Sequence, residues 1–369
     1  MNTLILSPAG PMATITSRSP AIGQWAARHV SPWWTVAQHR AIDPAGGPQL
    51  EAVVVTRDAV APVIENVLSH PNRSTEYAGD LLYYRRDDHE GTVTAAQPKR
   101  GLVYRYEQHA RCMTIVGSDT VTVANASARL ARELVRAQLH SAGWHLLRAS
   151  AAVGDKDQAI LALGPAEVGK TTTSLLLARA GRQLLAPNRV FARVQDGLVR
   201  LVPWPSTAAI GLGLLASLGA YDTVRERVLD GAQLPTAQPP AVTAALTSGS
   251  RAALWTETGT ELKMRLFPDQ IISWLGCHLA REGYAAQIVF PSIWPNAQQP
   301  TLGPAPHVED RDFHTPGADR YPDVFGLLHL PATAAAERED LCATLNTLPR
   351  HSAILTHDSA ANTAALAQL

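Results

Sequence analysis

Residues 164–171 of the chain are Gly164-Pro165-Ala166-Glu167-Val168-Gly169-Lys170-Thr171. A glycine, four residues and then Gly-Lys-Thr is the pattern of a phosphate-binding loop, or P-loop. Its glycines allow the loop to turn so that successive backbone N–H groups point at phosphate oxygens. Lys170 can reach the β- and γ-phosphates, and Thr171 supplies the hydroxyl that binds Mg²⁺. We therefore expect the residues from Gly164 to Thr172 to bind a nucleoside triphosphate, ATP or GTP, together with Mg²⁺.

The sequence on either side of the loop supports this interpretation. An apolar strand is predicted directly before it, at residues 160–163, and consecutive leucines at 175–177 indicate a helix after it. Strand, loop and helix must follow in this order for the helix dipole and the loop amides to act on the same phosphates. Glu167 is unfavourable in such a loop unless its carboxylate points away from the phosphates or meets a basic group.

Length and composition set wide limits on the rest of the molecule. The chain has 369 residues, more than one hydrophobic core normally organises, so we expect two or three domains. Apolar residues make up 46% of the chain, which excludes wholesale disorder. Lys plus Arg equals Asp plus Glu, at 32 each, and this balance argues against a protein that binds bulk nucleic acid or an anionic membrane.

The apolar stretches and the cysteines bear on where the protein works. The longest apolar stretch, residues 208–218, is well short of the roughly 20 residues that span a bilayer. Cys112, Cys277 and Cys342 lie far apart, without metal-ligand spacing, and are typical of a reduced compartment. Together these features predict a cytoplasmic protein without a membrane partner.

The predicted strands and helices divide the chain into three parts and give an α/β fold class. Residues 1–141 form a mixed α/β domain, with an antiparallel meander at 81–116, that would select or present an acceptor. Residues 142–295 form the P-loop nucleotide-binding domain. Residues 296–369 begin with a loop-rich segment and end with a strand, a helix and a strand that complete the fold.

A helix from Asn125 to about His140 closes the first part. Its apolar positions fall on one helical face, whereas Arg129, Arg132 and Arg136 lie towards the opposite side. We expect these three arginines to form a solvated helix face.

The residues after the P-loop helix resemble a known family. Residues 179–190 have the sequence Arg-Ala-Gly-Arg-Gln-Leu-Leu-Ala-Pro-Asn-Arg-Val. Without a gap, this run is similar to the Arg-Gly-His-Arg-Leu-like stretch and the following Ala-Asp-Asp-Arg-Val of bacterial HPr kinase/phosphorylase, whose fold is related to phosphoenolpyruvate carboxykinase. The resemblance is strong over residues 147–190, extends weakly to about Phe290 and does not cover the N-terminal part. It implies a P-loop domain of this type and an ATP-dependent phosphotransferase.

The departures from the family fall on its catalytic residues. The family's acid/base Asp corresponds to Pro187, its metal-side Asp to Asn188 and its His to Arg148. A proline cannot take up a proton, and an asparagine can offer a carbonyl oxygen to Mg²⁺ but cannot act as a base. An arginine stays charged, so it can bind a phosphate but cannot carry protons. The resemblance therefore keeps the phosphate cradle and loses the usual apparatus for proton transfer.

A small set of side chains would then carry the chemistry. We expect Lys170, Arg148 and Arg189 to contact phosphate or substrate. Thr171 would share the metal ion with Asn188.

Two further groups of charged residues are candidates for the site. Lys263 and Arg265 lie on one face of a predicted strand at 261–266, where they would either clamp a transferring phosphoryl group or face solvent. Asp196, Asp222 or Glu257 could replace the missing carboxylate.

Three functions remain open on these residues. The first is an ATP-dependent phosphotransferase for a peptide or small molecule, which the resemblance places in specialised metabolism. Such a transfer depends mostly on positioning and charge. The second is a different group transfer or ligation on the same fold, such as an aminoacyl-tRNA-dependent transferase with tRNA as a partner. The third is a catalytically inactive, nucleotide-binding regulatory protein. In each case the chain could form a homo-oligomer.

Overall fold

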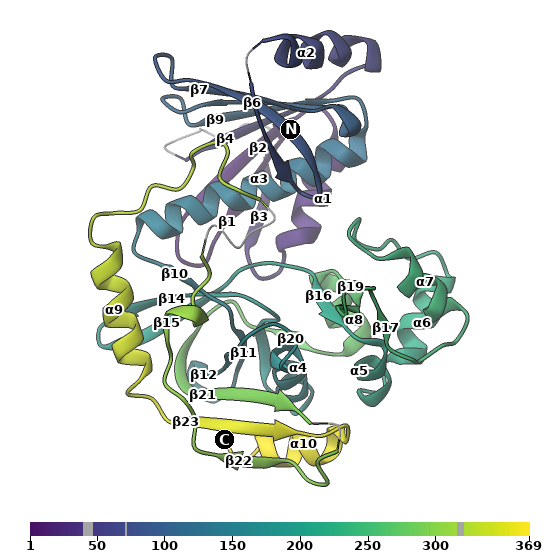
Figure 1. Ribbon diagram of the computed structural model, residues 1–369, viewed down its shortest axis with the longest axis vertical. Helices are drawn as coiled ribbons and strands as arrows, with labels where there is room; N and C mark the ends of the chain where they lie inside the picture. Colours follow the sequence, from purple (N-terminus) through teal and green to yellow (C-terminus); the bar gives the residue numbers. More distant parts are fainter. Residues whose placement is uncertain (40–46, 71, 295, 316–320) are drawn as a thin grey trace. The chain divides into compact units, whose positions relative to one another are not determined.

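The computed structural model describes residues 1–39, 47–70, 72–294, 296–315 and 321–369 (Figure 1). They belong to two compact units, which we call the N-terminal unit and, after the predicted loop that it contains, the P-loop unit. The N-terminal unit comprises residues 1–143 and 315–332, and the P-loop unit comprises residues 144–314 and 333–369. The segment 315–332 thus groups with the first unit, whereas the sequence predicts it to be part of the C-terminal region.

The N-terminal unit is built on a mixed sheet with the strand order β3-β1-β2-β4-β9-β8-β7-β6-β5. Strand β4 runs parallel to β2 and β9, and the strands from β6 to β9 form the predicted antiparallel meander. The strands are β1 (Asn2–Leu6), β2 (Met12–Ser17), β3 (Thr35–His39), β4 (Gln49–Val54), β5 (Arg73–Tyr77), β6 (Asp80–Asp87), β7 (Thr92–Gln97), β8 (Leu102–Glu107) and β9 (Cys112–Gly117).

Helices cover both faces of this sheet. Helix α2 packs on β7 and β8 through a cluster that includes Val103, whereas α3 lies against β2, β4 and β9 and holds Arg129 beside Tyr104. Neighbouring residues of a strand point to opposite faces, so α2 and α3 lie on opposite sides of the sheet. Helix α1 packs along α3. The bounds are α1 (Pro20–Val30), α2 (Arg57–Ser69), α3 (Thr120–Ser141) and the 3₁₀ turn η1 (Pro98–Arg100).

The arginines of α3 are the main correction to the predicted N-terminal part. Arg129 is only 8% exposed and Arg136 only 3%, so the prediction of a solvated face is wrong for both. Arg129 donates a hydrogen bond to the hydroxyl of Tyr77, and its guanidinium lies 4.4 Å from the centre of that ring and 4.7 Å from the ring of Tyr321. Arg136 pairs with Glu133 at 2.8 Å. The rings of Tyr77 and Tyr321 and the carboxylate of Glu133 thus surround two guanidinium groups that helical spacing alone would place in water.

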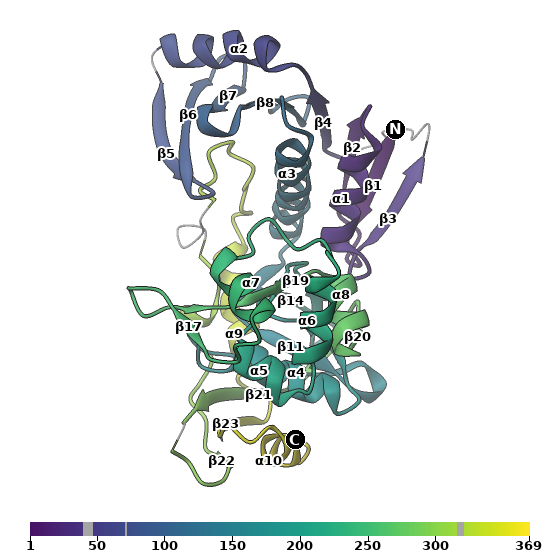
Figure 2. The ribbon, with the colours of Figure 1, turned by 90° about the vertical axis from the view of Figure 1, so that its right-hand side faces the viewer.

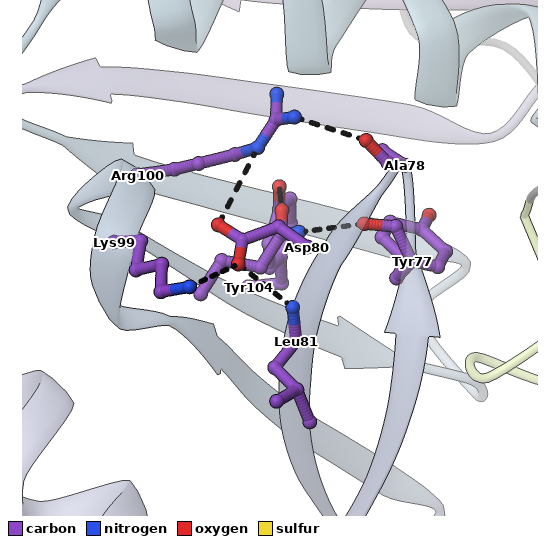
Figure 3. A network of polar contacts seen from close by, with 8 residues as sticks. Tyr77, Ala78, Asp80, Leu81, Lys99, Arg100 and Tyr104 are labelled. Carbon is purple, nitrogen blue, oxygen red and sulfur yellow. Dashed lines mark hydrogen bonds and ion pairs between the residues drawn. The ribbon is translucent and has the colours of Figure 1, made fainter. Parts of the chain in front are cut away.

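Polar contacts also join the strands around this aromatic group. The Tyr104 hydroxyl donates to Gln97 at 2.8 Å, and the Gln97 amide donates to the Tyr77 carbonyl at 2.9 Å. At the adjacent turn, Lys99 and Arg100 converge on the carboxylate of Asp80 (Figure 3).

The P-loop unit is built on a second mixed sheet with the order β10-β14-β15-β21-β12-β11-β13-β20, and β23 joins it beside β21 with β22 at its other edge. Strand β12 is central and buried along most of its length. The strands are β10 (His145–Leu147), β11 (Ser150–Val153), β12 (Gln158–Ala162), β13 (Gln183–Ala186), β14 (Val190–Gln195), β15 (Leu198–Pro203), β20 (His278–Leu279), β21 (Gly283–Ile293), β22 (Thr301–Gly303) and β23 (Arg350–Leu355).

Helices and two small sheets complete this unit. Helix α4 packs against β11 and β13, and α9 contributes Leu341 and Leu345 to the main core. The helices α5 to α8 gather with β17 and β19 beside α4 (Figure 2), where β16 pairs with β19 and β18 pairs with β17. Their bounds are α4 (Lys170–Arg179), α5 (Leu212–Ser217), α6 (Tyr221–Leu229), α7 (Pro240–Thr247), α8 (Pro268–Leu275), α9 (Ala334–Leu345), α10 (Ser359–Leu366), β16 (Ala208–Ile210), β17 (Leu254–Trp255), β18 (Glu261–Leu262), β19 (Met264–Leu266), η2 (Asp155–Asp157) and η3 (Asp310–Asp312).

Several predicted strands differ from the structure. The predicted strand at 146–153 is interrupted at Arg148, so that β10 pairs with β14 while β11 lies between β12 and β13. The predicted strand at 261–266 is likewise interrupted at Lys263. Residues 324–330 were expected to form a buried strand but contain only turns and irregular backbone. In the part of the chain that the structure describes, no helix combines the length and apolar character needed to cross a membrane.

Candidate functional site

Residues 164–171 connect the central strand β12 to the start of α4. Gly164 and Gly169 have φ angles of +128° and +108°, which L side chains rarely adopt. A Cβ on Gly169 would also lie 3.0 Å from a side-chain carbon of Ile293, so a larger residue would press on that side chain as well as strain the backbone. Sequence and structure therefore agree on a strand, a tight loop and a helix at this point.

Lys170 is the first residue of α4 and is only 8% exposed. Its Nζ donates hydrogen bonds to the carbonyls of Gly164, at 2.8 Å, and Pro165. Burial, and then the positive charge of Arg148, lowers the pKa of this amine to about 8, with Lys263 adding to the effect. The amine is thus a buried cation whose charge Asp312 compensates only in part, and it would be stabilised by an anion in the loop.

Thr171 lies where the loop meets the end of β13. Its hydroxyl donates a 2.9 Å hydrogen bond to the carbonyl of Pro187, next to the exposed Asn188. The structure therefore brings the two predicted metal ligands to neighbouring positions. Hydroxyl and amide oxygens are hard ligands of the kind that Mg²⁺ accepts alongside phosphate oxygens, so these residues fit a bound Mg²⁺.

Glu167 is unfavourable in a phosphate-binding loop unless its carboxylate points away from the phosphates. In the structure another strand orients this side chain. Its carboxylate accepts a hydrogen bond from the backbone N–H of Glu261 at 3.3 Å. The side chain of Glu261 in turn pairs with Lys263 at 3.3 Å. The positive charge of Lys263 helps to lower the pKa of the Lys170 amine. The Glu167 carboxylate is thus held towards the backbone of β18, and the nearby Lys263 pairs with Glu261.

Arg265, the second member of the predicted clamp, is placed differently. Its backbone N–H donates to the side chain of Gln238 at 2.7 Å. Within the described residues, Lys263 lowers the pKa of Lys170, whereas Arg265 is not among the groups that shift it. Arg189 is half-buried, and its carbonyl accepts a hydrogen bond from Trp204 at 3.4 Å. Neither contact links Arg189 or Arg265 to the loop.

The structure adds one residue that sequence reasoning missed. Asp312, in η3, is only 4% exposed, and its carbonyl accepts a 2.8 Å hydrogen bond from the backbone N–H of Arg148. The negative charge of its carboxylate raises the pKa of the Lys170 amine. Burial raises the pKa of Asp312 even though a hydrogen bond from the Glu309 N–H, Arg311 and Lys170 oppose that shift. Asp312 lies in a loop-rich stretch without any motif, so no sequence signal marks it.

The acidic residues proposed as substitutes lie elsewhere in the P-loop unit. Asp222, on α6, pairs with Arg251 at 3.1 Å. Asp196 lies in the turn between β14 and β15, with a φ of +53°, and Glu257 in the turn between β17 and β18. In the described ranges, none of the three is among the groups that shift the pKa of Lys170.

The N-terminal unit contains a separate pocket of about 440 Å³ between α3 and residues 327–329. Its walls include the apolar side chains of Leu134 and Leu327 and the polar side chains of Tyr106, Arg111 and His329. This volume and this mixed lining are typical of sites for small molecules.

Comparisons with known proteins add little to this geometry. No protein-family model and no curated protein matches the chain. Among solved structures, the Hpr(Ser) kinase/phosphatase from Coxiella burnetii matches with 14% sequence identity over 42% of this chain and 69% of that chain, with a TM-score of 0.20. A TM-score this low carries no argument about the present chain. The α/β class therefore stands on the two mixed sheets and their helices.

Proposed function

We propose that the chain is an ATP-dependent phosphotransferase whose acceptor is a peptide or a small molecule of specialised metabolism. The observation that carries the proposal is the loop between β12 and α4, with two glycines at positive φ and the buried Lys170 at its end. Backbone N–H groups at a helix N-terminus, together with a lysine, form a binding site for the phosphates of a nucleotide.

The residues around the loop have distinct parts in the proposed transfer. Lys170 and the loop N–H groups hold the β- and γ-phosphates. Arg148 and Lys263, both within electrostatic reach of Lys170, balance the negative charge of the transferring phosphoryl group. Mg²⁺, held by Thr171 and Asn188 with the phosphate oxygens, would supply further neutralisation of that charge.

The acceptor would be selected by the N-terminal unit. The 440 Å³ pocket supports this assignment because it offers a cation and apolar walls to a small molecule or a peptide side chain. Arg111→Ala should then raise the KM for the acceptor and leave the affinity for nucleotide unchanged. An unchanged KM would remove the pocket from the proposal.

The direct test is purified protein with Mg²⁺ and γ-labelled ATP, assayed for nucleotide binding, for release of phosphate and for label transferred to peptide or small-molecule acceptors. Lys170→Met is the matched negative control. Label on an acceptor, lost in this variant, supports a phosphotransferase. Tight nucleotide binding with neither hydrolysis nor transfer would contradict it and leave a regulatory nucleotide-binding protein.

One observation favours a second candidate, a transferase that uses an aminoacyl-tRNA. Strand β13 is followed by Pro187 and Asn188 instead of two carboxylates, and the cations Arg148 and Lys263 both lower the pKa of Lys170. Such a site suits a substrate that brings its own phosphates. This reading predicts tRNA binding that weakens steeply between 50 and 200 mM salt, whereas a kinase for a neutral acceptor shows no such dependence.

A further inference from the structure

The proposed phosphotransferase lacks a base at the position where the sequence leads one to look for it. At the end of β13, Pro187 has no titratable group and Asn188 cannot accept a proton. General-base assistance by a carboxylate contributes about 10²–10⁴-fold to such a transfer, so its source matters. The only carboxylate among the described residues that shifts the pKa of Lys170 is that of Asp312.

Strand-like pairing on the open side of β10 joins the backbone of Asp312 to residues 146–148. The Arg148 N–H donates to the Asp312 carbonyl at 2.8 Å, Leu147 forms a bridge with Phe313, and the His314 N–H donates to Leu146 at 2.7 Å. Two residues beyond Arg148, the hydroxyl of Ser150 donates to the carbonyl of Lys170. The residues from 146 to 150 thus join Asp312 on one side to the start of α4 on the other.

The segment that carries Asp312 is fixed on its second side by α9. The guanidinium of Arg338 lies 4.5 Å from the ring centre of Phe313, and Arg338 also pairs with Asp310 at 2.7 Å. Just after the end of α9, the side chain of Asn346 accepts from the N–H of Val308 at 2.8 Å and donates to its carbonyl at 3.0 Å. A group held in this way needs little reorganisation before it reacts.

The surroundings of the carboxylate suit a base. Desolvation raises its pKa, and the charged groups that face it are Lys170, Arg311 and Glu309, whose backbone N–H donates to one carboxylate oxygen at 2.9 Å. A buried carboxylate with a raised pKa accepts protons more readily than an exposed one. The hydrogen bond from the Glu309 N–H, then Arg311 and then Lys170 oppose the rise in pKa and favour the ionised form.

We infer that Asp312 is the general base of this enzyme and takes the place of the carboxylate that is absent after β13. The inference rests on the proposed phosphotransferase function. As the acceptor oxygen forms its bond to the γ-phosphorus, its proton passes to the Asp312 carboxylate. The bond from the γ-phosphorus to the bridging oxygen breaks, and ADP leaves with that electron pair. The proton is later released to solvent, so the reaction converts acceptor and ATP to phosphorylated acceptor, ADP and H⁺.

The test uses water as the acceptor, since release of inorganic phosphate from ATP requires no knowledge of the natural substrate. Asp312→Asn keeps an oxygen for the N–H of Glu309 but removes the base. The rate should fall by about 10²-fold or more with unchanged nucleotide affinity. Glu339→Gln, which neutralises an exposed carboxylate on α9, is the matched control and should keep the wild-type rate.

Two further measurements separate a base from a structural or metal-binding carboxylate. In Asp312→Ala, added formate should restore part of the rate, because a small carboxylate can occupy the vacated position. Asp312→Asn should show no recovery at high Mg²⁺, whereas recovery would make Asp312 a metal ligand and overturn the inference. A wild-type rate in Asp312→Asn would also overturn it. Wild-type protein that binds ATP but never turns it over would instead refute the proposed function itself.

Discussion

The buried amine of Lys170 predicts how nucleotide binding depends on pH. Burial, and then the charges of Arg148 and Lys263, lowers its pKa from 10.5 to about 8. A bound triphosphate places negative charge at the amine and moves the pKa back up. Because the protonated amine binds phosphate, the affinity should be constant below about pH 8 and should fall about tenfold per pH unit above it.

The size of this effect has an upper limit. Restoring the pKa from about 8 to its ordinary 10.5 corresponds to at most about 3 kcal/mol of binding free energy. At pH 9 the affinity should be about tenfold weaker than at pH 7.5. ATP is fully ionised over this range, so the change reports on the protein.

Fluorescence titration with a labelled ATP analogue and Mg²⁺ between pH 7 and 9.5 would measure this dependence. Lys170→Arg keeps its charge at every pH, so its affinity should not vary. Lys170→Met should bind weakly throughout the range. Lys156→Met, in an exposed turn of the same unit, is the control that should behave as wild type. A wild-type affinity that is flat to pH 9.5, or the same slope in Lys170→Met, would refute the reasoning.

Three further outcomes are expected from single changes. Gly169→Ala should lose nucleotide binding and about 1–3 kcal/mol of stability in denaturant unfolding, because its φ is +108° and the new methyl meets a neighbouring side chain. Gly181→Ala, at a φ of +103° in open space, should lose stability without losing binding. Arg129→Ala should lower the stability of the N-terminal unit by about 2–4 kcal/mol, because it leaves a cavity and a tyrosine hydroxyl without its donor, whereas the exposed Arg105→Ala should change it little. Thr171→Ala should raise the Mg²⁺ concentration needed for half-maximal turnover, and chelation of Mg²⁺ should abolish turnover in both this variant and the wild type. An unchanged Mg²⁺ requirement would remove Thr171 from the metal site.

Predictions that rest on local sequence agree well with the structure. The meander at 81–116 follows from short runs of β-forming residues separated by turns, and neighbouring strands pair in that order. The strand and helix on either side of residues 164–171 follow from apolar runs beside a glycine loop. Such features are decided within a few residues, where backbone conformation and turn chemistry dominate.

Predictions that depend on what packs against an element are less secure. The apolar positions of α3 indicate a helix correctly, but the helix begins at Thr120 behind the cap Asp119 and not at Asn125. Arg129 and Arg136 are buried because Tyr77, Tyr321 and Glu133 lie against them. Helical spacing shows which side chains share a face and says nothing about whether that face meets solvent. Similarly, the apolar run at 146–153 does not show that the strand breaks at a charged residue and that its halves occupy separate positions in the sheet.

The sequence by itself therefore determined where phosphates are expected, because the glycine spacing, Lys170 and Thr171 act through one turn of backbone and the start of one helix. It also showed that the chemistry beside the loop lacks the two carboxylates of the family that it resembles. Only the tertiary structure decided which carboxylate lies near the loop, since Asp312 and Arg148 are distant in the chain and meet by pairing along β10. Contacts between distant segments depend on how the sheet and α9 are assembled, which no short pattern encodes.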